Sequence, residues 1–110
     1  MHTGNLFADN QAPAQGERFE ALLSHRNLVV ERIVSSGHAQ PQDYLQAQDE
    51  WVVLLQGQAR LNVAGEVVEL SSGDYLFLVA GVSHRVEQAS PGALWLAVHL
   101  HPEHTGEQTP

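Results

Sequence analysis

Residues 50–84 read EWVVLLQGQARLNVAGEVVELSSGDYLFLVAGVSH, and this stretch decides the fold. Short runs of Val, Leu and aromatic residues, typical of buried strands, alternate in it with turns marked by glycine. The stretch begins at Glu50 and ends at His84, two residue types that bind metals or move protons. The two ends can meet only if the sheet folds over. We therefore expect an antiparallel sheet that closes into a barrel.

The segments on either side of this stretch add further strands. Similar patterns predict strands in the segments 28–34, 43–46, 50–56, 59–63, 66–70, 75–79, 84–88 and 93–101. Turn residues recur about every 8 to 10 positions between them, which is typical of a small all-β sandwich or barrel. One helix is predicted over residues 17–24, where Phe19, Leu22 and Leu23 have the i, i+3, i+4 spacing of an amphipathic helix.

A chain of 110 residues is long enough for one core and leaves little room for a second. We expect three parts: an N-terminal arm over residues 1–16, a barrel domain over residues 17–101 that the helix closes at one end, and a flexible tail over residues 102–110. The arm and the tail lack the apolar periodicity of packed elements.

Composition excludes several kinds of partner. The sequence has 13 acidic and 5 basic residues, a formal net charge of −8, which argues against nucleic acid because a phosphate backbone attracts basic surfaces. Its apolar runs are far shorter than the roughly 20 residues of a membrane-spanning helix. Residues 1–11 lack the basic start and apolar block of a secretory signal, so we expect no membrane contact and a cytoplasmic location. Cysteine is absent, so nitrogen and oxygen atoms must bind any metal.

Strand alternation predicts which side chains face inward. Glu50, Val52 and Leu54 share one face of their strand, and His84 and Val86 face inward if Arg85 and Glu87 face solvent. In the last strand Trp95, Ala97, His99 and His101 oppose a stripe of leucine and valine. A single barrel interior can cover only one face of each strand, and large apolar patches on monomers are rare. We therefore predict a homodimer through the outer apolar face.

The glycine and ligand spacings resemble those of the cupins. Gly73, Gly81 and His84 keep every spacing of the second cupin motif, with Val79 where the family usually has proline. Glu50, six residues and Gly57 match the second half of the first motif. The resemblance covers residues 33–100 and implies a double-stranded β-helix, or jelly-roll, barrel. Fold alone does not fix chemistry.

In cupins, two histidines and a glutamate of the first motif and the histidine of the second bind one divalent metal. The resemblance carries this role to Glu50 and His84, whereas Tyr44 and Gln46 stand where the two histidines should be. The phrase Tyr44-x-Gln46-x-x-x-Glu50-Trp51 resembles a variant found in small single-domain cupins. It implies a site of Gln46, Glu50 and His84, with His99 as a second imidazole and Tyr44 as a pocket wall. Such a set suits Fe(II) and tolerates Zn, Mn or Ni.

Each of these residues also has a plainer interpretation. Glu50 could be a solvated residue at the barrel mouth, His84 and His99 could be hydrogen-bonded interior histidines, and Gln46 is a weak neutral ligand. A tyrosine must lose a proton with a pKa of about 10 before it binds a metal well. The other histidines have no predicted role.

Three functions are compatible with this pattern. The first is a metal-dependent enzyme on a small organic molecule, such as an oxygenase, isomerase or lyase, in which Glu50 or Tyr44 moves a proton. The second is a non-catalytic module that binds or senses a metal or metabolite. The third is a scaffold that has lost its metal site, since two motif histidines are missing.

Overall fold

The computed structural model describes residues 1–38 and 40–103, and every regular element in these ranges is a β-strand. The strands are β1 (Glu17–His25), β2 (Leu28–Ser35), β3 (Asp43–Tyr44), β4 (Asp49–Gln56), β5 (Gln58–Val63), β6 (Glu66–Ser71), β7 (Tyr75–Leu78), β8 (His84–Ala89) and β9 (Leu94–Leu100). The predicted all-β class is thereby confirmed. No helix in this part of the chain is long and apolar enough to cross a membrane. Most of the predicted tail, residues 104–110, lies outside the described residues.

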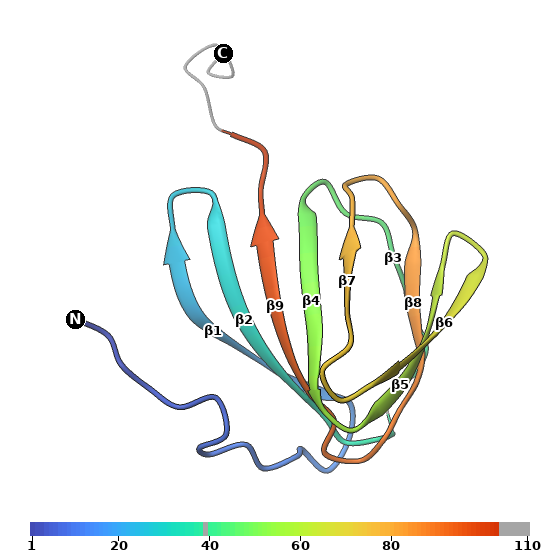
Figure 1. Ribbon diagram of the computed structural model, residues 1–110, viewed down its shortest axis with the longest axis horizontal. Coiled ribbons are helices and arrows are strands. Elements are labelled where there is room, and N and C mark those ends of the chain that lie inside the picture. Colours follow the sequence, from blue (N-terminus) through green and yellow to red (C-terminus); the bar gives the residue numbers. More distant parts are fainter. Residues whose placement is uncertain (39, 104–110) are drawn as a thin grey trace.

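The strands form two antiparallel sheets that face each other. One sheet has the order β1-β2-β9-β4-β7, and the other has the order β3-β8-β5-β6. Figure 1 shows the sheets converging at the lower end of the view and separating toward the upper end. Strands β4 and β9 lie side by side, and Glu50 is paired with His99 in the wide half while Leu54 is paired with Trp95 in the narrow half. The two halves of the same strands therefore reach different environments.

The helix predicted over residues 17–24 is wrong, because this segment is strand β1, which pairs with β2 along its length. A β-bulge between Ala21 and Leu23 explains the error. A bulge inserts one unpaired residue and breaks the period of two, so apolar residues on either side of it acquire a helix-like spacing. A turn in which Arg26 adopts a positive φ of 55° then returns the chain into β2.

The core fills the narrow half of the barrel. Leu54, Leu61 and Trp95 are at most 3% exposed, and they come from both sheets. The chain passes from β4 to β5, and so from one sheet to the other, at Gly57, whose φ is 102°. A Cβ atom at this position would lie 2.6 Å from the Ser90 Oγ and 3.1 Å from the Ala93 Cα, so both the conformation and the space require glycine.

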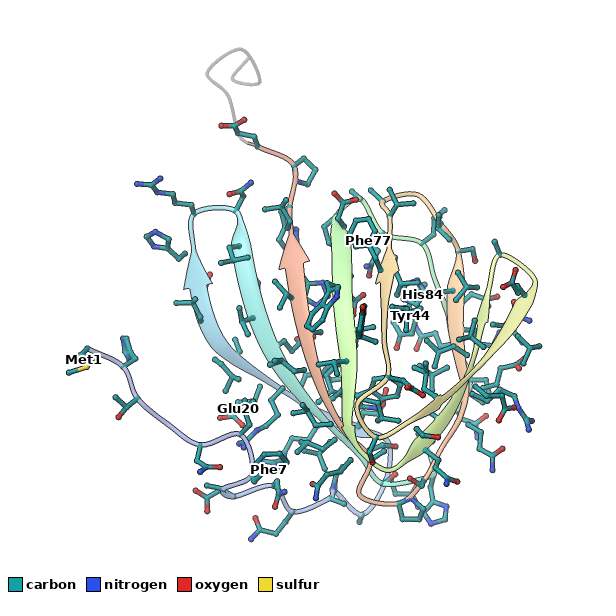
Figure 2. The ribbon with its side chains drawn as sticks, in the orientation of Figure 1. Met1, Phe7, Glu20, Tyr44, Phe77 and His84 are labelled. Carbon is teal, nitrogen blue, oxygen red and sulfur yellow. The ribbon has the colours of Figure 1, made fainter. Side chains whose placement is uncertain are left out.

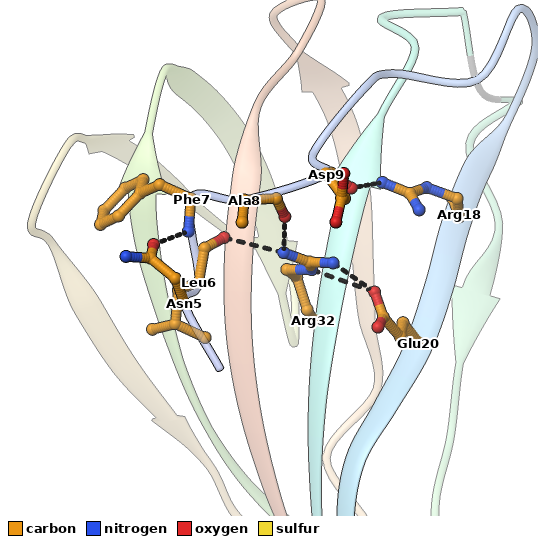
Figure 3. A network of polar contacts seen from close by, with 8 residues as sticks. All are labelled: Asn5, Leu6, Phe7, Ala8, Asp9, Arg18, Glu20 and Arg32. Carbon is orange, nitrogen blue, oxygen red and sulfur yellow. Dashed lines mark hydrogen bonds and ion pairs between the residues drawn. The ribbon is translucent and has the colours of Figure 1, made fainter. Parts of the chain in front are cut away.

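The N-terminal arm is held against the outer face of the larger sheet by Arg32 of β2. This side chain is 6% exposed, donates to the carbonyl oxygens of Leu6 and Ala8 at 3.0 and 2.6 Å, and forms an ion pair with Glu20 of β1 (Figure 3). Arg18 donates to the carbonyl oxygen of Asp9 at 2.8 Å. One buried cation thus joins the arm to both strands of the first hairpin.

Candidate functional site

A cavity of about 360 Å³ lies between the two sheets. Apolar side chains from both sheets line part of it, namely Ile33, Val52, Leu61, Leu78, Val86 and Trp95. Polar side chains line the rest, among them Tyr44, Gln46, Gln48, Glu50, His84 and His99. Pockets of this volume with an apolar wall and a few converging polar groups are typical of small-molecule sites.

The ends of the stretch that decides the fold meet at this cavity. Glu50 and His84 are each 7% exposed, and the Glu50 Oε1 lies 3.9 Å from the His84 Nε2. Gln46 donates from Nε2 to the same carboxylate oxygen at 2.9 Å. Gln46 lies in the loop after β3, which ends two residues earlier than predicted, and its carbonyl oxygen accepts a hydrogen bond from the Gly81 backbone amide. This backbone hydrogen bond therefore joins the segment before Glu50 to the turn before His84, next to the two side chains.

Tyr44 forms one wall of the site. It is paired with His84 across β3 and β8, and the two rings stack with centroids 5.6 Å apart (Figure 2). Burial raises the pKa of the Tyr44 hydroxyl above its usual value, and the carboxylates of Glu17 and Glu50 raise it further. A phenol with a raised pKa is a poor anionic metal ligand at neutral pH, so the environment favours Tyr44 as a neutral hydroxyl that can donate a hydrogen bond.

His99 lies beside Glu50 on the neighbouring strand, but its ring is bound to other partners. Its Nε2 lies 3.2 Å from the Glu31 Oε1, and its Nδ1 lies 3.3 Å from the Gln48 Nε2. An amide nitrogen can only donate and a carboxylate can only accept, so these contacts assign the ring proton to Nε2. Both ring nitrogens of His99 are therefore engaged by Glu31 and Gln48.

The predicted metal ligands are only partly brought together as the side chains stand. Within residues 1–38 and 40–103, no three His, Asp or Glu side chains are arranged to hold a metal ion. Of the residues predicted as ligands, Gln46, Glu50 and His84 are together, whereas His99 is turned toward Glu31 and Gln48. A fourth donor would require His99 to leave both partners.

The sequence prediction missed four polar residues that line the cavity: Glu17, Glu31, Gln48 and His101. The signal for Glu31 was present, since alternation places it on the same face of β2 as Val29 and Ile33, where a carboxylate is unusual. His101 stacks against His99 with ring centroids 6.2 Å apart. Burial raises the pKa of the Glu17 carboxyl, and the nearby charge of Glu31 raises it further.

The sequence and the fold both match known proteins. The family model of the cupin domain matches residues 30–99. The chain belongs to the cupin family. Many solved structures are similar to this cupin, and no curated protein matches its sequence.

Three of the similar structures span a wide range of identity. A protein from Ralstonia eutropha JMP134 named as a "putative mannose-6-phosphate isomerase" is 37% identical over 93% of this cupin and 100% of that chain, with a TM-score of 0.85. TT1209 from Thermus thermophilus is 20% identical, covers 93% and 100% of the two chains, and has a TM-score of 0.79. A protein from Thermotoga maritima named as a predicted oxalate decarboxylase is 21% identical over 78% and 81%, with a TM-score of 0.66. The last two show the fold alone.

Proposed function

We propose that this cupin binds a small polar organic molecule in its barrel, between the buried pair of Glu50 and His84 and the apolar wall. The observation that supports this most directly is the pair itself, a carboxylate and an imidazole 3.9 Å apart at a cavity of about 360 Å³. Burying two ionisable groups is costly unless they have partners or a use. Gln46 and Tyr44 hold the pair in place but do not enclose it.

A catalytic role is the second candidate, because the pair has the composition of an acid–base couple. A substrate atom in the cavity beside the pair, off the line that joins the Glu50 Oε1 and the His84 Nε2, can lie within hydrogen-bonding distance of both groups, so one would remove a proton and the other would return it. The name of the Ralstonia protein includes an isomerase activity, and isomerisation is one reaction that needs such a transfer. A binding module would hold the same molecule without turnover.

Binding is testable with the two tryptophans, because they lie on opposite faces of the larger sheet. Trp95 lines the cavity, whereas Trp51 faces away from it. A Trp51→Phe variant therefore reports ligand binding through Trp95 fluorescence, and Trp95→Phe is the matched control. In a panel of small metabolites we expect a binder whose affinity falls at least about tenfold in Glu50→Gln and in His84→Gln. An exposed carboxylate on β6 provides a control variant, Glu69→Gln, which should bind as the wild type does.

Two results would contradict the proposal: a panel without any binder, or a binder that the Glu50 and His84 variants retain at full affinity. Turnover of the bound compound would separate an enzyme, such as an isomerase, lyase or oxygenase, from a binding module. A cytoplasmic location stays a prediction.

Cupins commonly bind divalent metals, and the set of Gln46, Glu50, His84 and His99 stays a prediction for this chain. Metal analysis of protein purified without a His tag tests it directly. One equivalent of Fe, Zn, Mn or Ni, lost in the double variant Glu50→Ala and His84→Ala, would support the predicted set. The binding proposed above requires no metal, since the contacts of Gln46 and Tyr44 orient the pair without one.

We also propose that the protein forms a homodimer through the outer face of the larger sheet. Trp51 of β4 is opposite Phe77 of β7, and Val53 is opposite Tyr75, so these side chains form one continuous patch. Trp51, Tyr75 and Phe77 are 37, 66 and 59% exposed. The arm is bound at Arg32 of β2, two strands away from β4. A patch of three exposed aromatic residues is rare on a monomer, and a two-fold contact of this face with itself would cover it.

Light scattering tests the dimer. We expect a mass near twice the monomer mass of 12.0 kDa, and a fall to one monomer mass in Phe77→Glu. The matched control is Val67→Glu, since Val67 is exposed on β6 of the other sheet and its charge should leave the dimer intact. A monomer mass for the wild type would overturn the proposal.

A further inference from the structure

The charge of the cavity wall restricts what the cavity can bind. Three carboxylates line it, those of Glu17, Glu31 and Glu50, and no arginine of the described residues does. The sequence contains no lysine. Four of the five arginines are engaged elsewhere: Arg18 with the Asp9 carbonyl, and Arg32, Arg60 and Arg85 with Glu20, Glu69 and Asp43. A permanent positive charge is therefore missing where a phosphate or carboxylate of a ligand would need one.

Two groups of the wall hold their protons more tightly than usual, first through burial and then through this negative charge. Burial and the charge of Glu31 raise the pKa of Glu17, and burial together with Glu17 and Glu50 raises the pKa of Tyr44. Among the described residues of the wall, the compensating groups are imidazoles, and His99 donates to Glu31 from its Nε2. A wall on which the charge of Glu31 already disfavours the ionisation of Glu17 will also disfavour an anionic ligand and favour a cation.

The apolar part of the wall sets a second requirement on the ligand. Trp95 lines the cavity together with Ile33, Val52, Leu61, Leu78 and Val86, and it is 3% exposed. A bound molecule therefore needs carbon atoms that contact these side chains, in addition to a group that suits the acidic part of the wall. The Trp95 Nε1–H is itself buried out of reach of the cavity, so the indole reports binding through contacts of its ring.

We propose that the molecule bound in the barrel is a small organic cation, an amine. Its ammonium group faces the acidic part of the wall, which Glu17, Glu31 and Glu50 form, and its carbon atoms contact the apolar part. This assignment rests on the binding function proposed above and gives its ligand class. It separates this cupin from a phosphosugar enzyme such as the name of the Ralstonia protein describes, because a phosphate dianion would meet three carboxylates and no arginine.

The indole signal of Trp95 in a proton–nitrogen NMR spectrum tests the assignment. The sequence has two tryptophans, so Trp51→Phe identifies the Trp95 signal by elimination, and the Trp51 signal of the wild type is an internal control for surface effects. The probes are D-mannosamine, D-mannose and D-mannose 6-phosphate, which share one carbon skeleton, together with a fragment set of small amino alcohols, diols, hydroxy acids and phosphate monoesters of equal size. The titrations are run at about pH 8, where an ordinary imidazole is neutral.

We expect amines to shift the Trp95 signal with the highest affinity and phosphate esters to leave it unchanged. The double variant Glu17→Gln and Glu31→Gln should weaken amine binding at least about tenfold and should narrow the difference between amines and neutral compounds. The exposed carboxylate of Glu69 gives the control variant Glu69→Gln, which should change neither. If the double variant does not fold, raising the NaCl concentration from about 20 to 500 mM should weaken amines selectively, because salt screens charge interactions.

Other outcomes would overturn the assignment in distinguishable ways. If phosphate esters or hydroxy acids shift the Trp95 signal more than amines do, the ligand class is wrong and binding in the barrel stands. If only neutral compounds shift the Trp95 signal, the ligand class is again wrong and binding in the barrel again stands. If no compound of any class shifts it, both the ligand class and the proposed binding function fail.

Discussion

The wide and narrow halves of the barrel are built by the same strands but have opposite properties. In the narrow half, Leu54 of β4 is paired with Trp95 of β9, and both are buried among core residues. Four residues away on each strand, Glu50 is paired with His99, and both contact polar partners in the cavity wall. Because side chains alternate with a period of two, all four share the inner face. The side chains of each half, and not its backbone, therefore determine whether that half stabilises the fold or forms the site.

This separation predicts its largest effect for Leu54→Ala. Leu54 is 0% exposed, so truncation removes buried methyl groups and leaves a space among neighbours from both sheets. We expect a loss of about 3 kcal/mol in the free energy of unfolding, measured by urea denaturation. The comparison variant is Glu50→Gln in the wide half, which keeps the size and the hydrogen-bonding capacity of the side chain. It should cost less than about 1 kcal/mol. Similar losses for the two variants would remove the distinction between the halves.

A smaller effect is expected for Arg32→Met on the outer face of the same sheet. The side chain of Arg32 is 6% exposed and binds Glu20 and two carbonyl oxygens of the arm, so methionine would keep much of the packing but none of these bonds. The Glu20 side chain is 44% exposed, so water can solvate its carboxylate in the variant. This solvation limits the loss in the free energy of unfolding to about 2 kcal/mol. Hydrogen exchange should be faster in the arm of the variant than in the arm of the wild type, and the exchange of β4 should be unchanged. Arg60→Met breaks an exposed ion pair with Glu69 and should leave the melting temperature unchanged.

The sequence was sufficient for the parts of the fold that follow simple periodicity. Alternation placed Glu50, His84 and Trp95 on the inner face, and glycine spacing located the corner at Gly57. It failed at β1, because a bulge breaks the period of two and the residues beside it acquire helical spacing. A bulge depends on how the partner strand pairs, which a single strand's sequence does not specify.

Side-chain direction limited the prediction of the site. Motif spacing brought Gln46, Glu50 and His84 to one place, because turns of fixed length connect their strands. The pairing of His99 with Glu31 and Gln48 depends on rotamers and on contacts between β2, β9 and a loop, which spacing along the chain does not encode. Glu17 was missed for a simpler reason, since it lay in the segment predicted as a helix.

The smallest expected effect is a pH-dependent one, and Glu17 is the residue to test it. Burial and the charge of Glu31 raise the pKa of Glu17 in the folded protein above its ordinary value of 4.5. The folded state therefore binds this proton more tightly than the unfolded state does, so protonated Glu17 favours folding below the ordinary value. That contribution is lost as the pH rises through the raised value.

Glu17→Gln removes this titration, since glutamine has the shape of the protonated acid. We expect the variant and the wild type to melt at the same temperature at about pH 4, where Glu17 is largely protonated in the folded wild type. At about pH 7 the variant should melt about 2 °C higher, a modest gain because the side chain is partly solvated and water screens its charge. Differential scanning calorimetry across this range measures the difference directly. A gain of equal size at both pH values would show that packing, and not the charge beside Glu31, separates the two proteins.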